Sequence, residues 1–307
     1  MELRKSYVET LSTLMKQNDK IVVLDADLAG AGGTKPLYKE FPTRAIECGI
    51  AEANMACIAA GLSASGYIPF IHSFAPFSSR RIFDQIAVSI SYSEQNVKII
   101  GWDPGVTTTT NGGTHMCFED VAMMRALCNM AVVDIVDDVQ IAKALPQIAE
   151  HNGSVYVRME RKGSGSFYGP DYEFHFGKAE KLRDGKDITV IASGALLYDA
   201  REAVERLAAE GVSADFLAIH TIKPLDEQAI LASAKKTGRV LVVENHSIHG
   251  GLYSAVCELL SAQLPTRCDA VAVRDRITQV GSLKDLKRDY NLTCNDIIAR
   301  ARGLLNK

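Results

Sequence analysis

Glu52 is the residue of this chain with the clearest potential for proton-transfer chemistry. It closes the motif Gly49-Ile50-Ala51-Glu52, follows a short strand-like stretch at 44–47, and is predicted to begin a mostly apolar helix. A carboxylate in the first turn of a helix complements the helix dipole, so a surface acid is one interpretation. The other is a carboxylate held in an apolar cleft, where it could exchange a proton with a ring nitrogen of a bound cofactor.

Two further motifs follow predicted strands. Phe74 and Phe77 stand three residues apart around a proline, and such a pair can be a core contact or an aromatic face for a planar ring. His115 ends a long polar loop whose last residues are Asn111-Gly112-Gly113-Thr114-His115. Long loops inside compact domains are usually functional or disordered, so this histidine is a candidate for proton transfer or hydrogen bonding.

Other signals are weaker. The turn at 30–33 is glycine-rich and could cradle phosphate or be a plain flexible loop, since it lacks both common phosphate-loop motifs. Arg4 opens a predicted helix and Arg158 ends a predicted strand, positions at which arginines bind phosphate or simply face solvent. His246 and His249 have no cysteine or acidic partner at metal-ligand spacing, so no metal site is predicted.

The elements that must position these residues alternate between strands and helices, which predicts parallel sheets covered on both faces. In the first series the expected strands are 21–24, 44–47, 67–72, 97–101, 131–136 and 154–158, and the expected helices are 3–17, 51–64, 78–92, 119–128 and 139–150. A glycine-rich stretch at 161–170 breaks this pattern. In the second series the expected strands are 188–192, 213–218, 239–243 and 270–273, and the expected helices are 199–210, 226–236, 250–262, 282–289 and 293–304.

The chain is therefore predicted to be an α/β protein of two domains, each a mainly parallel sheet flanked by helices. The first domain is expected at 1–162, a linker at 163–186 and the second domain at 187–307. Ligands of such sheets bind beyond the carboxyl ends of the strands, which is where the candidate residues of the first domain fall.

Composition excludes several classes of function. With 307 residues, 47% hydrophobic and 23% charged, and a net charge of -3, the chain reads as an ordinary globular protein without a surface for nucleic acid. It has neither a signal-peptide core nor an apolar run long enough to span a membrane, so a cytoplasmic protein is expected. The 7 cysteines include no C-x-x-C pair and are expected to be reduced thiols.

Taken together, these residues resemble the thiamine-diphosphate enzymes of the transketolase family, and specifically the C-terminal half of a transketolase. The motifs that carry the resemblance are Gly49-Ile50-Ala51-Glu52, Phe74-x-x-Phe77 and Gly113-Thr114-His115, in that order. The resemblance covers essentially the whole chain. It implies a pyrimidine-binding domain followed by a transketolase C-terminal domain, and the transfer of a two-carbon ketol unit from a ketose phosphate to an aldose phosphate.

The resemblance also implies roles for single residues. Glu52 would bond to N1′ of the aminopyrimidine of thiamine diphosphate and favour the imino tautomer, which then removes the C2 proton of the thiazolium. Phe77, with Phe74 beside it, would form the platform for the pyrimidine, although either ring could be the one that stacks. Asp27 matches a family acid close to the cofactor, and His115 matches a histidine that bonds to a substrate oxygen.

The remaining matches concern the substrate. Arg4 and Arg158 match arginines that grip the sugar phosphate. Asn111 stands where many transketolases have an aspartate that reads a donor hydroxyl, Trp102 stands where a substrate histidine is common, and Ala31 replaces a phosphate-binding serine. These departures leave thiamine chemistry in place and the identity of the sugar open.

One expected part of the family is absent. A full-length member carries an N-terminal domain whose G-D-G motif, followed by an asparagine, holds Mg²⁺ and the diphosphate, but here the sole Asp-Gly pair lies at 184–185, in the predicted linker. We therefore expect half an enzyme, whose partner polypeptide supplies that site, in an α₂β₂ heterotetramer by analogy. Two alternatives stay open: a 2-oxo acid dehydrogenase E1 β-type subunit, and a non-catalytic regulatory homologue.

Overall fold

The computed structural model describes residues 2–163 and 165–306 of the chain. Its contacts divide the chain into two compact units. The first unit consists of Met1–Pro104 and Met123–Phe176, and the second of Gly105–Ala122 and Gly177–Lys307. The predicted domain boundaries stay a prediction, but one segment of the first series of elements, Gly105–Ala122, packs with the second unit.

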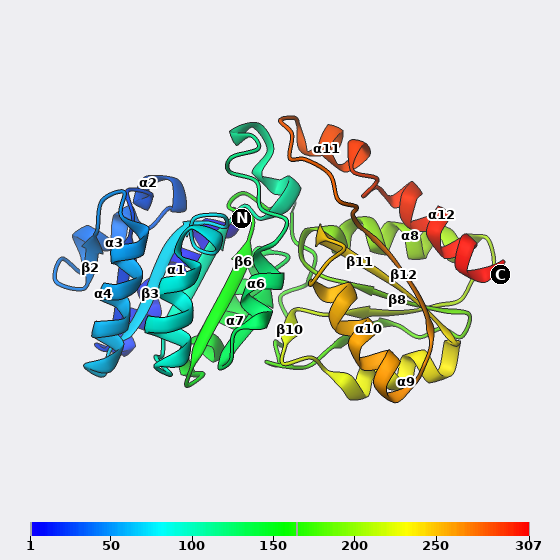
Figure 1. Cartoon of the computed structure of the whole chain (residues 1–307), viewed down its shortest axis with the longest axis horizontal. Helices are drawn as coiled ribbons and strands as arrows, with labels where there is room; N and C mark the ends of the chain where they lie inside the picture. The colour runs from blue at the N-terminus through cyan, green and yellow to red at the C-terminus, as the bar shows by residue number, and fades with distance from the viewer. Residues whose placement is uncertain (1, 164, 307) are drawn as a thin grey trace. The chain divides into compact units, whose positions relative to one another are not determined.

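A parallel sheet forms the centre of the first unit (Figure 1). Its strands lie in the order β5-β6-β4-β3-β1-β2, and every neighbouring pair is parallel. Their bounds are β1 (Ile21–Asp25), β2 (Ala45–Glu47), β3 (Ile68–Phe74), β4 (Lys98–Trp102), β5 (Met130–Asp134) and β6 (Ser154–Met159). All residues of β1, β4, β5 and β6 are buried, as expected for apolar runs in a sheet covered on both faces.

The helices of the first unit are α1 (Leu3–Gln17), α2 (Ala29–Gly32), α3 (Lys35–Glu40), α4 (Glu52–Ala64), α5 (Phe83–Gln85) and α7 (Asp138–Glu150). A further helix, α6 (Asp120–Ala126), begins in the segment of the second unit and ends in the first. The buried faces of α1 and α7 belong to one core cluster with side chains from β1, β3, β4, β5 and β6. The expected single helix over 78–92 is instead a 3₁₀ turn η1 (Arg80–Ile82), then α5, then a π-helical stretch η2 (Ile86–Tyr92).

The second unit contains a second sheet, of strand order β12-β11-β8-β9-β7. Its strands are β7 (Glu180–Arg183), β8 (Ile188–Ala192), β9 (Ala214–Ala218), β11 (Arg239–Ser247) and β12 (Arg267–Val273). β7 runs antiparallel to β9, and it was not expected, because it is a short edge strand of mostly charged residues inside the predicted linker. The other neighbouring pairs are parallel, so the predicted α/β class is confirmed for both sheets.

Helices of the second unit flank this sheet. They are α8 (Leu197–Ala209), α9 (Glu227–Thr237), α10 (Leu252–Gln263), α11 (Leu283–Asp289) and α12 (Cys294–Leu305), with short segments η4 (Gly194–Leu196) and β10 (Thr221–Lys223). Of these helices, α9, α11 and α12 begin at side-chain caps. Asp226 caps α9, and Thr293 forms a capping box with Asp296 at the start of α12.

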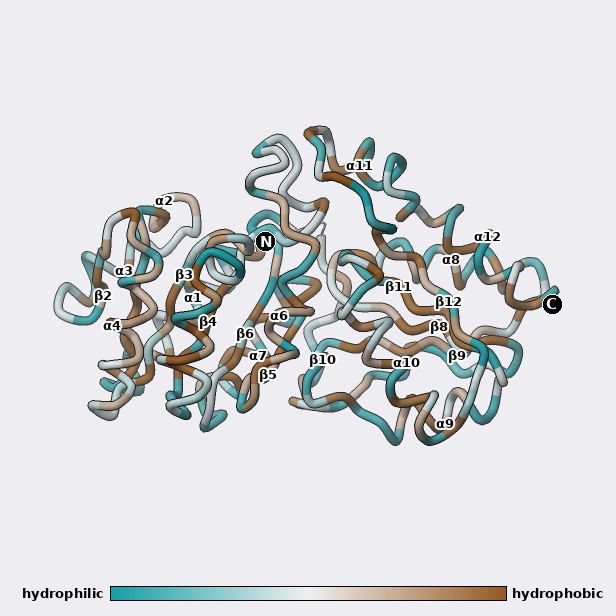
Figure 2. The backbone as a smooth tube through the Cα atoms, in the orientation of Figure 1, coloured by the Kyte–Doolittle hydropathy of each residue, from teal (hydrophilic) through white to brown (hydrophobic). Residues whose placement is uncertain are grey.

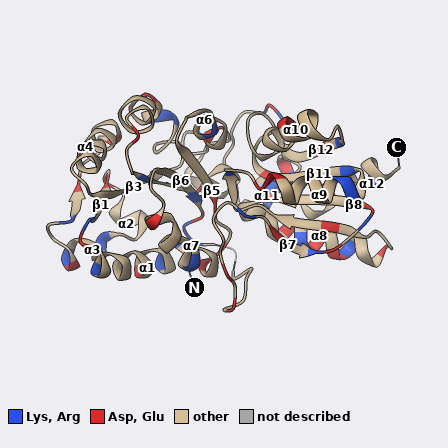
Figure 3. Ribbon diagram, turned by 90° about the horizontal axis from the view of Figure 1, so that it is seen from below, with Lys and Arg blue, Asp and Glu red and all other residues tan. Residues whose placement is uncertain are grey.

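Hydropathy and charge follow this architecture. Brown, apolar segments gather on strands such as β8 and β11 in Figure 2, whereas Figure 3 shows both signs of charge along helices such as α8. No helix in the described part of the chain combines the length and the apolarity that a membrane crossing requires.

Candidate cofactor and substrate site

Glu52 is a buried carboxylate, not a surface acid. It is the first residue of α4, its side chain is 5% exposed, and the residue before it, Ala51, provides no side-chain cap. Nη1 of Arg81 donates to Oε1 of Glu52 at 2.6 Å. A buried ion normally has a partner of opposite charge, and Arg81 supplies it. The surface-acid interpretation is therefore wrong, and a carboxylate at a helix N-terminus in a mostly enclosed place is what the structure contains.

Phe74 and Phe77 lie next to each other at the end of β3. Their rings make an edge contact, with centroids 6.2 Å apart and an interplanar angle of 70°. Each ring also carries a guanidinium: Cζ of Arg81 lies 3.7 Å from the centroid of Phe77, and Cζ of Arg161 lies 4.7 Å from that of Phe74. Phe74 belongs to the core cluster with Phe77 packed against it, so the pair is a core contact whose faces also accept planar cations.

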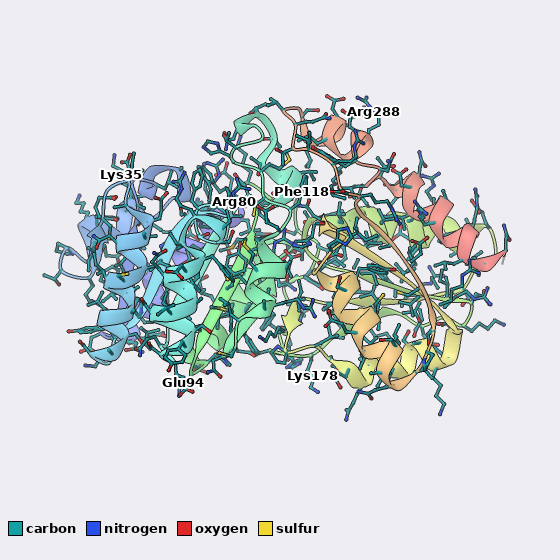
Figure 4. All side chains as sticks on the ribbon, in the orientation of Figure 1. Lys35, Arg80, Glu94, Phe118, Lys178 and Arg288 are labelled. Atoms are coloured by element: carbon teal, nitrogen blue, oxygen red, sulfur yellow. The ribbon has the colours of Figure 1, made fainter. Side chains whose placement is uncertain are left out.

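Asp27 lies at a bend just after β1. Its φ of 57° is in the left-handed region, and its N–H donates to Oε1 of Glu47 at 2.7 Å. The same oxygen of Glu47 accepts from the N–H of Gly49 at 2.9 Å, so one carboxylate ties this bend to the segment that leads into α4. An open pocket of about 360 Å³ lies here, with Lys35 labelled in Figure 4; it is lined by Asp27, Ala29, Gly30, Lys35, Tyr38 and Glu47.

A buried hydrogen-bond network underlies the glycine-rich turn. Oδ2 of Asp25 accepts from Oγ1 of Thr34 at 2.8 Å and from the hydroxyl of Tyr38 at 3.0 Å, and burial raises the pKa of Asp25. Deeper in the unit, the hydroxyl of Tyr7 and Nε2 of His72 are 2.6 Å apart. The turn itself forms the short helix α2. It is therefore an ordered segment tied to a buried acid rather than a plain flexible loop.

The two arginines selected from the sequence lie in different environments. Arg4 donates from Nη1 to the carbonyl of Ala31 at 3.0 Å and pairs with Glu2 at 2.9 Å. Arg158 is 1% exposed, and its Nη1 lies 3.5 Å from Oδ2 of Asp134, its register partner on the neighbouring strand. A guanidinium in that position can stabilise the core of the first unit by pairing with Asp134. That Arg158 binds a phosphate therefore stays a prediction beside this structural role.

Arg161 is a residue that the sequence reasoning missed. Its Nε donates to Oδ2 of Asp103 at 2.5 Å and its backbone N–H to Oδ1 at 2.8 Å, while its carbonyl accepts from the N–H of Arg4 at 2.9 Å. Burial raises the pKa of Asp103, and the Arg161 charge opposes that rise. The side chain of Arg161 is 20% exposed and lies past the end of β6, where sheets of this class bind ligands. Its place just after a predicted strand is the sequence feature that could have identified Arg161 as a candidate.

Trp102 lies in the first unit, whereas the predicted substrate residues Asn111 and His115 lie in a segment of the second unit. Trp102 is 1% exposed, and its ring contacts that of Tyr7 edge-on at 5.3 Å, so it belongs to the core. Asn111 and His115 belong to the segment grouped with the second unit, where Nδ1 of His115 lies 3.0 Å from Oγ1 of Thr114. That Asn111 and His115 share a site with Glu52 stays a prediction.

This segment is anchored to the second unit by backbone hydrogen bonds. It begins with the 3₁₀ stretch η3 (Gly105–Asn111), where the N–H of Val106 donates to Oδ1 of Asn245 at 2.9 Å. Further along, the carbonyl of Phe118 accepts from the N–H of Ser247 at 2.8 Å. The end of β11 therefore holds the loop that carries the predicted substrate residues.

Comparison with known proteins identifies the family. The model of the transketolase pyrimidine-binding domain matches residues 1–165, and that of the transketolase C-terminal domain matches residues 177–297. The chain belongs to the transketolase family. This agrees with the resemblance carried by Glu52, the phenylalanine pair and the Gly-Thr-His motif, and it favours a transketolase over the dehydrogenase alternative.

Individual relatives match this transketolase chain from end to end. The 6-deoxy-6-sulfo-D-fructose transketolase subunit SqwH of Clostridium sp. (strain MSTE9) is 46% identical, over 99% of this chain and 95% of its own length. One of the subunits of the apulose-4-phosphate transketolase of Phocaeicola vulgatus is 35% identical, over 99% and 97%. A solved structure described as a split gene transketolase, inactive beta4 tetramer, has 38% identity and a TM-score of 0.92, and covers 100% of this chain and 99% of its own. The chain is thus a transketolase subunit of the kind encoded by split genes.

Membership of this family implies dependence on thiamine diphosphate, and the first unit fits its pyrimidine. A buried carboxylate at a helix N-terminus and an aromatic face lie together, and a planar N–H donor, the guanidinium of Arg81, already contacts both. In the part of the chain that the structure describes, no group of three or more His, Cys, Asp or Glu side chains could hold a metal ion.

Proposed function

We propose that this chain transfers a two-carbon ketol unit from a ketose to an aldose phosphate, together with an N-terminal-half transketolase partner. The observation that carries the proposal is the buried Glu52 carboxylate beside the Phe74 and Phe77 rings, in a domain matched by the pyrimidine-binding model. A buried ion pair adds little net stability to a fold, and the partner of Glu52 is partly exposed, so a functional role for this acid is what we propose.

The residues of the first unit would hold the pyrimidine end of the cofactor. Glu52 would hydrogen-bond to N1′ and share one proton with this ring nitrogen, while Phe77 or Phe74 would stack on the ring. Asp27 would lie near the cofactor, at the pocket beyond β1. Bound thiamine diphosphate supplies the electron sink that allows the carbon–carbon bond of the ketose to break.

The partner would supply what this chain lacks. Its diphosphate-binding domain would hold the diphosphate and Mg²⁺, in an α₂β₂ heterotetramer that we place in the cytoplasm. The name of the solved relative, an inactive tetramer of β chains, supports this division, as do the end-to-end matches to two transketolase subunits. A polypeptide that carries half of the cofactor site should bind the cofactor poorly without the other half.

The substrate would be a ketose that bears an anionic group. The names of two relatives specify a sulfo sugar and a sugar phosphate, which share a tetrahedral oxyanion at the end of a short carbon chain. Arg4 and Arg158 are the predicted arginines, with Asn111 and His115 as the predicted groups for the sugar hydroxyls. Arg161 is the better-placed second arginine, because it is partly exposed and adjoins Arg4, whereas Arg158 is buried.

Calorimetric titration of thiamine diphosphate with Mg²⁺ tests the division of the site. The titrant is added to this chain alone and then to this chain mixed with its N-terminal-half partner. We expect binding only to the mixture, followed by ketol transfer when phosphorylated and sulfonated ketoses are screened. Tight binding to the isolated chain would contradict the half-site proposal, and binding without any transfer would favour the non-catalytic homologue.

A further inference from the structure

Arg81 forms an ion pair with Glu52 that the proposed chemistry does not use. Its Nη1 lies 2.6 Å from Oε1 of Glu52, and its Cζ lies 3.7 Å from the centroid of the Phe77 ring. The guanidinium therefore stacks on the ring and donates to the carboxylate at the same time. At this distance the two groups are in van der Waals contact, so no second planar group fits between them.

A guanidinium and an aminopyrimidine bind to the same two kinds of group, an aromatic face and a carboxylate. Both are planar, present a face to an aromatic ring and direct N–H groups at a carboxylate. Glu52 and Phe77 are the groups assigned above to the pyrimidine. A side chain of this chain and the proposed cofactor therefore compete for one place.

The exposure of the pair indicates which partner moves. The side chain of Arg81 is 45% exposed, whereas that of Glu52 is 5% exposed and fixed at the first residue of α4. Arg81 belongs to the single turn η1, and its backbone N–H is held by the carbonyl of Pro76 at 3.1 Å. The long side chain can swing into solvent while this turn stays in place, because nearly half of it is already exposed, and a ligand that donates to Glu52 would then replace it as the partner of the buried carboxylate.

We infer that Arg81 closes the pyrimidine site whenever no cofactor is bound and so sets the affinity of that site for the cofactor. In the closed state Arg81 satisfies the buried Glu52 carboxylate, and in the open state the pyrimidine takes over both contacts. The inference rests on the proposed function, since it takes thiamine diphosphate as the competing ligand. A site that is open only part of the time binds with a Kd raised by the inverse of the open fraction.

Two arginine substitutions in one turn test the competition. Arg81→Ala removes the competing group, and Arg80→Ala is the matched control, because this neighbouring exposed arginine (labelled in Figure 4) carries the same charge. Both variants are titrated with thiamine diphosphate and Mg²⁺ in the mixture with the N-terminal-half partner. We expect a Kd roughly three- to tenfold lower than wild type for Arg81→Ala and an unchanged Kd for Arg80→Ala.

An unchanged or higher Kd for Arg81→Ala overturns the inference, and a higher one would make Arg81 a group that binds the cofactor. Arg81→Lys is the second variant, for use if Arg81→Ala does not fold. It keeps the charge but loses the planar stacking, so a smaller fall in Kd is expected. If the wild-type mixture binds thiamine diphosphate and neither variant has a lower Kd, the inference alone is refuted. If the wild-type mixture binds no thiamine diphosphate, the proposed function is refuted as well.

The ion pair itself is tested on the chain alone, without cofactor or activity. Urea unfolding is measured for Arg81→Ala, Glu52→Gln and the double variant, which together form a double-mutant cycle. We expect the midpoint to fall in Arg81→Ala, because a buried carboxylate loses its partner, and to recover largely in the double variant. A cycle with no coupling between the two residues would mean that the closed state is not populated, which overturns the inference.

Discussion

Two buried glutamates, one in each unit, are satisfied in different ways. Glu52 of α4 is 5% exposed and accepts from the side chain of Arg81 at 2.6 Å. Glu244 of β11 is 1% exposed and accepts from the backbone N–H groups of Leu252 and Tyr253, at 2.7 and 3.1 Å, in the first turn of α10. One carboxylate is held by a side chain that is partly in solvent, and the other by the backbone of a helix.

The difference separates a group available for chemistry from a group that holds the fold. The amides at the start of α10 have no other intrahelical acceptor, so Glu244 is part of how that helix begins. Even Gly251 fits this contact, because a Cβ there would collide with Oε2 of Glu244. Arg81 can leave Glu52 without disturbing a helix, so Glu52 can exchange its partner for a ligand.

The largest expected effect is on activity, from Glu52→Gln. The amide cannot share a proton with a ring nitrogen, so ketol transfer by the reconstituted enzyme should fall by roughly 10²–10⁴-fold, the usual range for a lost acid–base group. The measurement is a steady-state assay with the partner subunit and a ketose phosphate. Glu150→Gln, an exposed carboxylate at the end of α7, is the control and should keep wild-type activity. Equal activity of the two variants would contradict the role of Glu52.

The same substitution at Glu244 should act on stability. Glu244→Gln places an amide NH₂ group against the N–H groups of α10, and one unsatisfied donor should lower the free energy of unfolding by about 1–3 kcal/mol. Urea unfolding of this chain measures it, with Glu52→Gln as the matched variant, for which a smaller loss is expected. If Glu52→Gln destabilised the chain as much as Glu244→Gln, the distinction between the two glutamates would fail.

Much of the first unit could be predicted from local sequence, and the partners of its side chains could not. Apolar runs separated by amphipathic segments predict the parallel sheets, and a helix starting at residue 51 or 52 places Glu52 in its first turn. That Glu52 pairs with Arg81 depends on how η1 turns back over α4, 29 residues later, and no local pattern encodes that approach. The π-helical turns of η2 were not predicted either, because π turns are rare and a stretch of 7 residues is too short to show a period different from that of an α-helix.

Two other outcomes depended on contacts between distant segments. The sequence places Arg158 at the end of a predicted strand, but β6 extends to Met159, so Arg158 lies inside the sheet beside Asp134 and Arg161 lies beyond it. Likewise, residues 105–122 follow a strand of the first unit but pack with the second, through contacts such as Val106 with Asn245, 139 residues apart. Such long-range pairings decide which candidates can meet a ligand.

Lys98 extends the comparison to a buried cation and gives the smallest expected effect. This residue of β4 is fully buried, and its Nζ donates to Oδ1 of Asn96 at 2.6 Å and to the carbonyls of His151 and Gly153 at 2.6 and 2.7 Å. Like Glu244, it is satisfied mainly by backbone, so a structural role is expected. Burial lowers the pKa of Lys98 to about 7.

The sign of its pH effect follows from proton counting. In the unfolded chain the amine keeps a pKa of about 10.4, so between pH 7 and pH 10 the unfolded state binds more protons than the folded state, and a rise in pH favours folding. From pH 7 to 8.5, Lys98 should add roughly 1–2 kcal/mol to the free energy of unfolding, and Lys98→Met should lack this increment. Urea unfolding at pH 7 and pH 8.5 gives the change in the free energy of unfolding for the wild type and for Lys98→Met. Equal changes in the two proteins would mean that the ammonium stays charged in the core, held by its three oxygen acceptors.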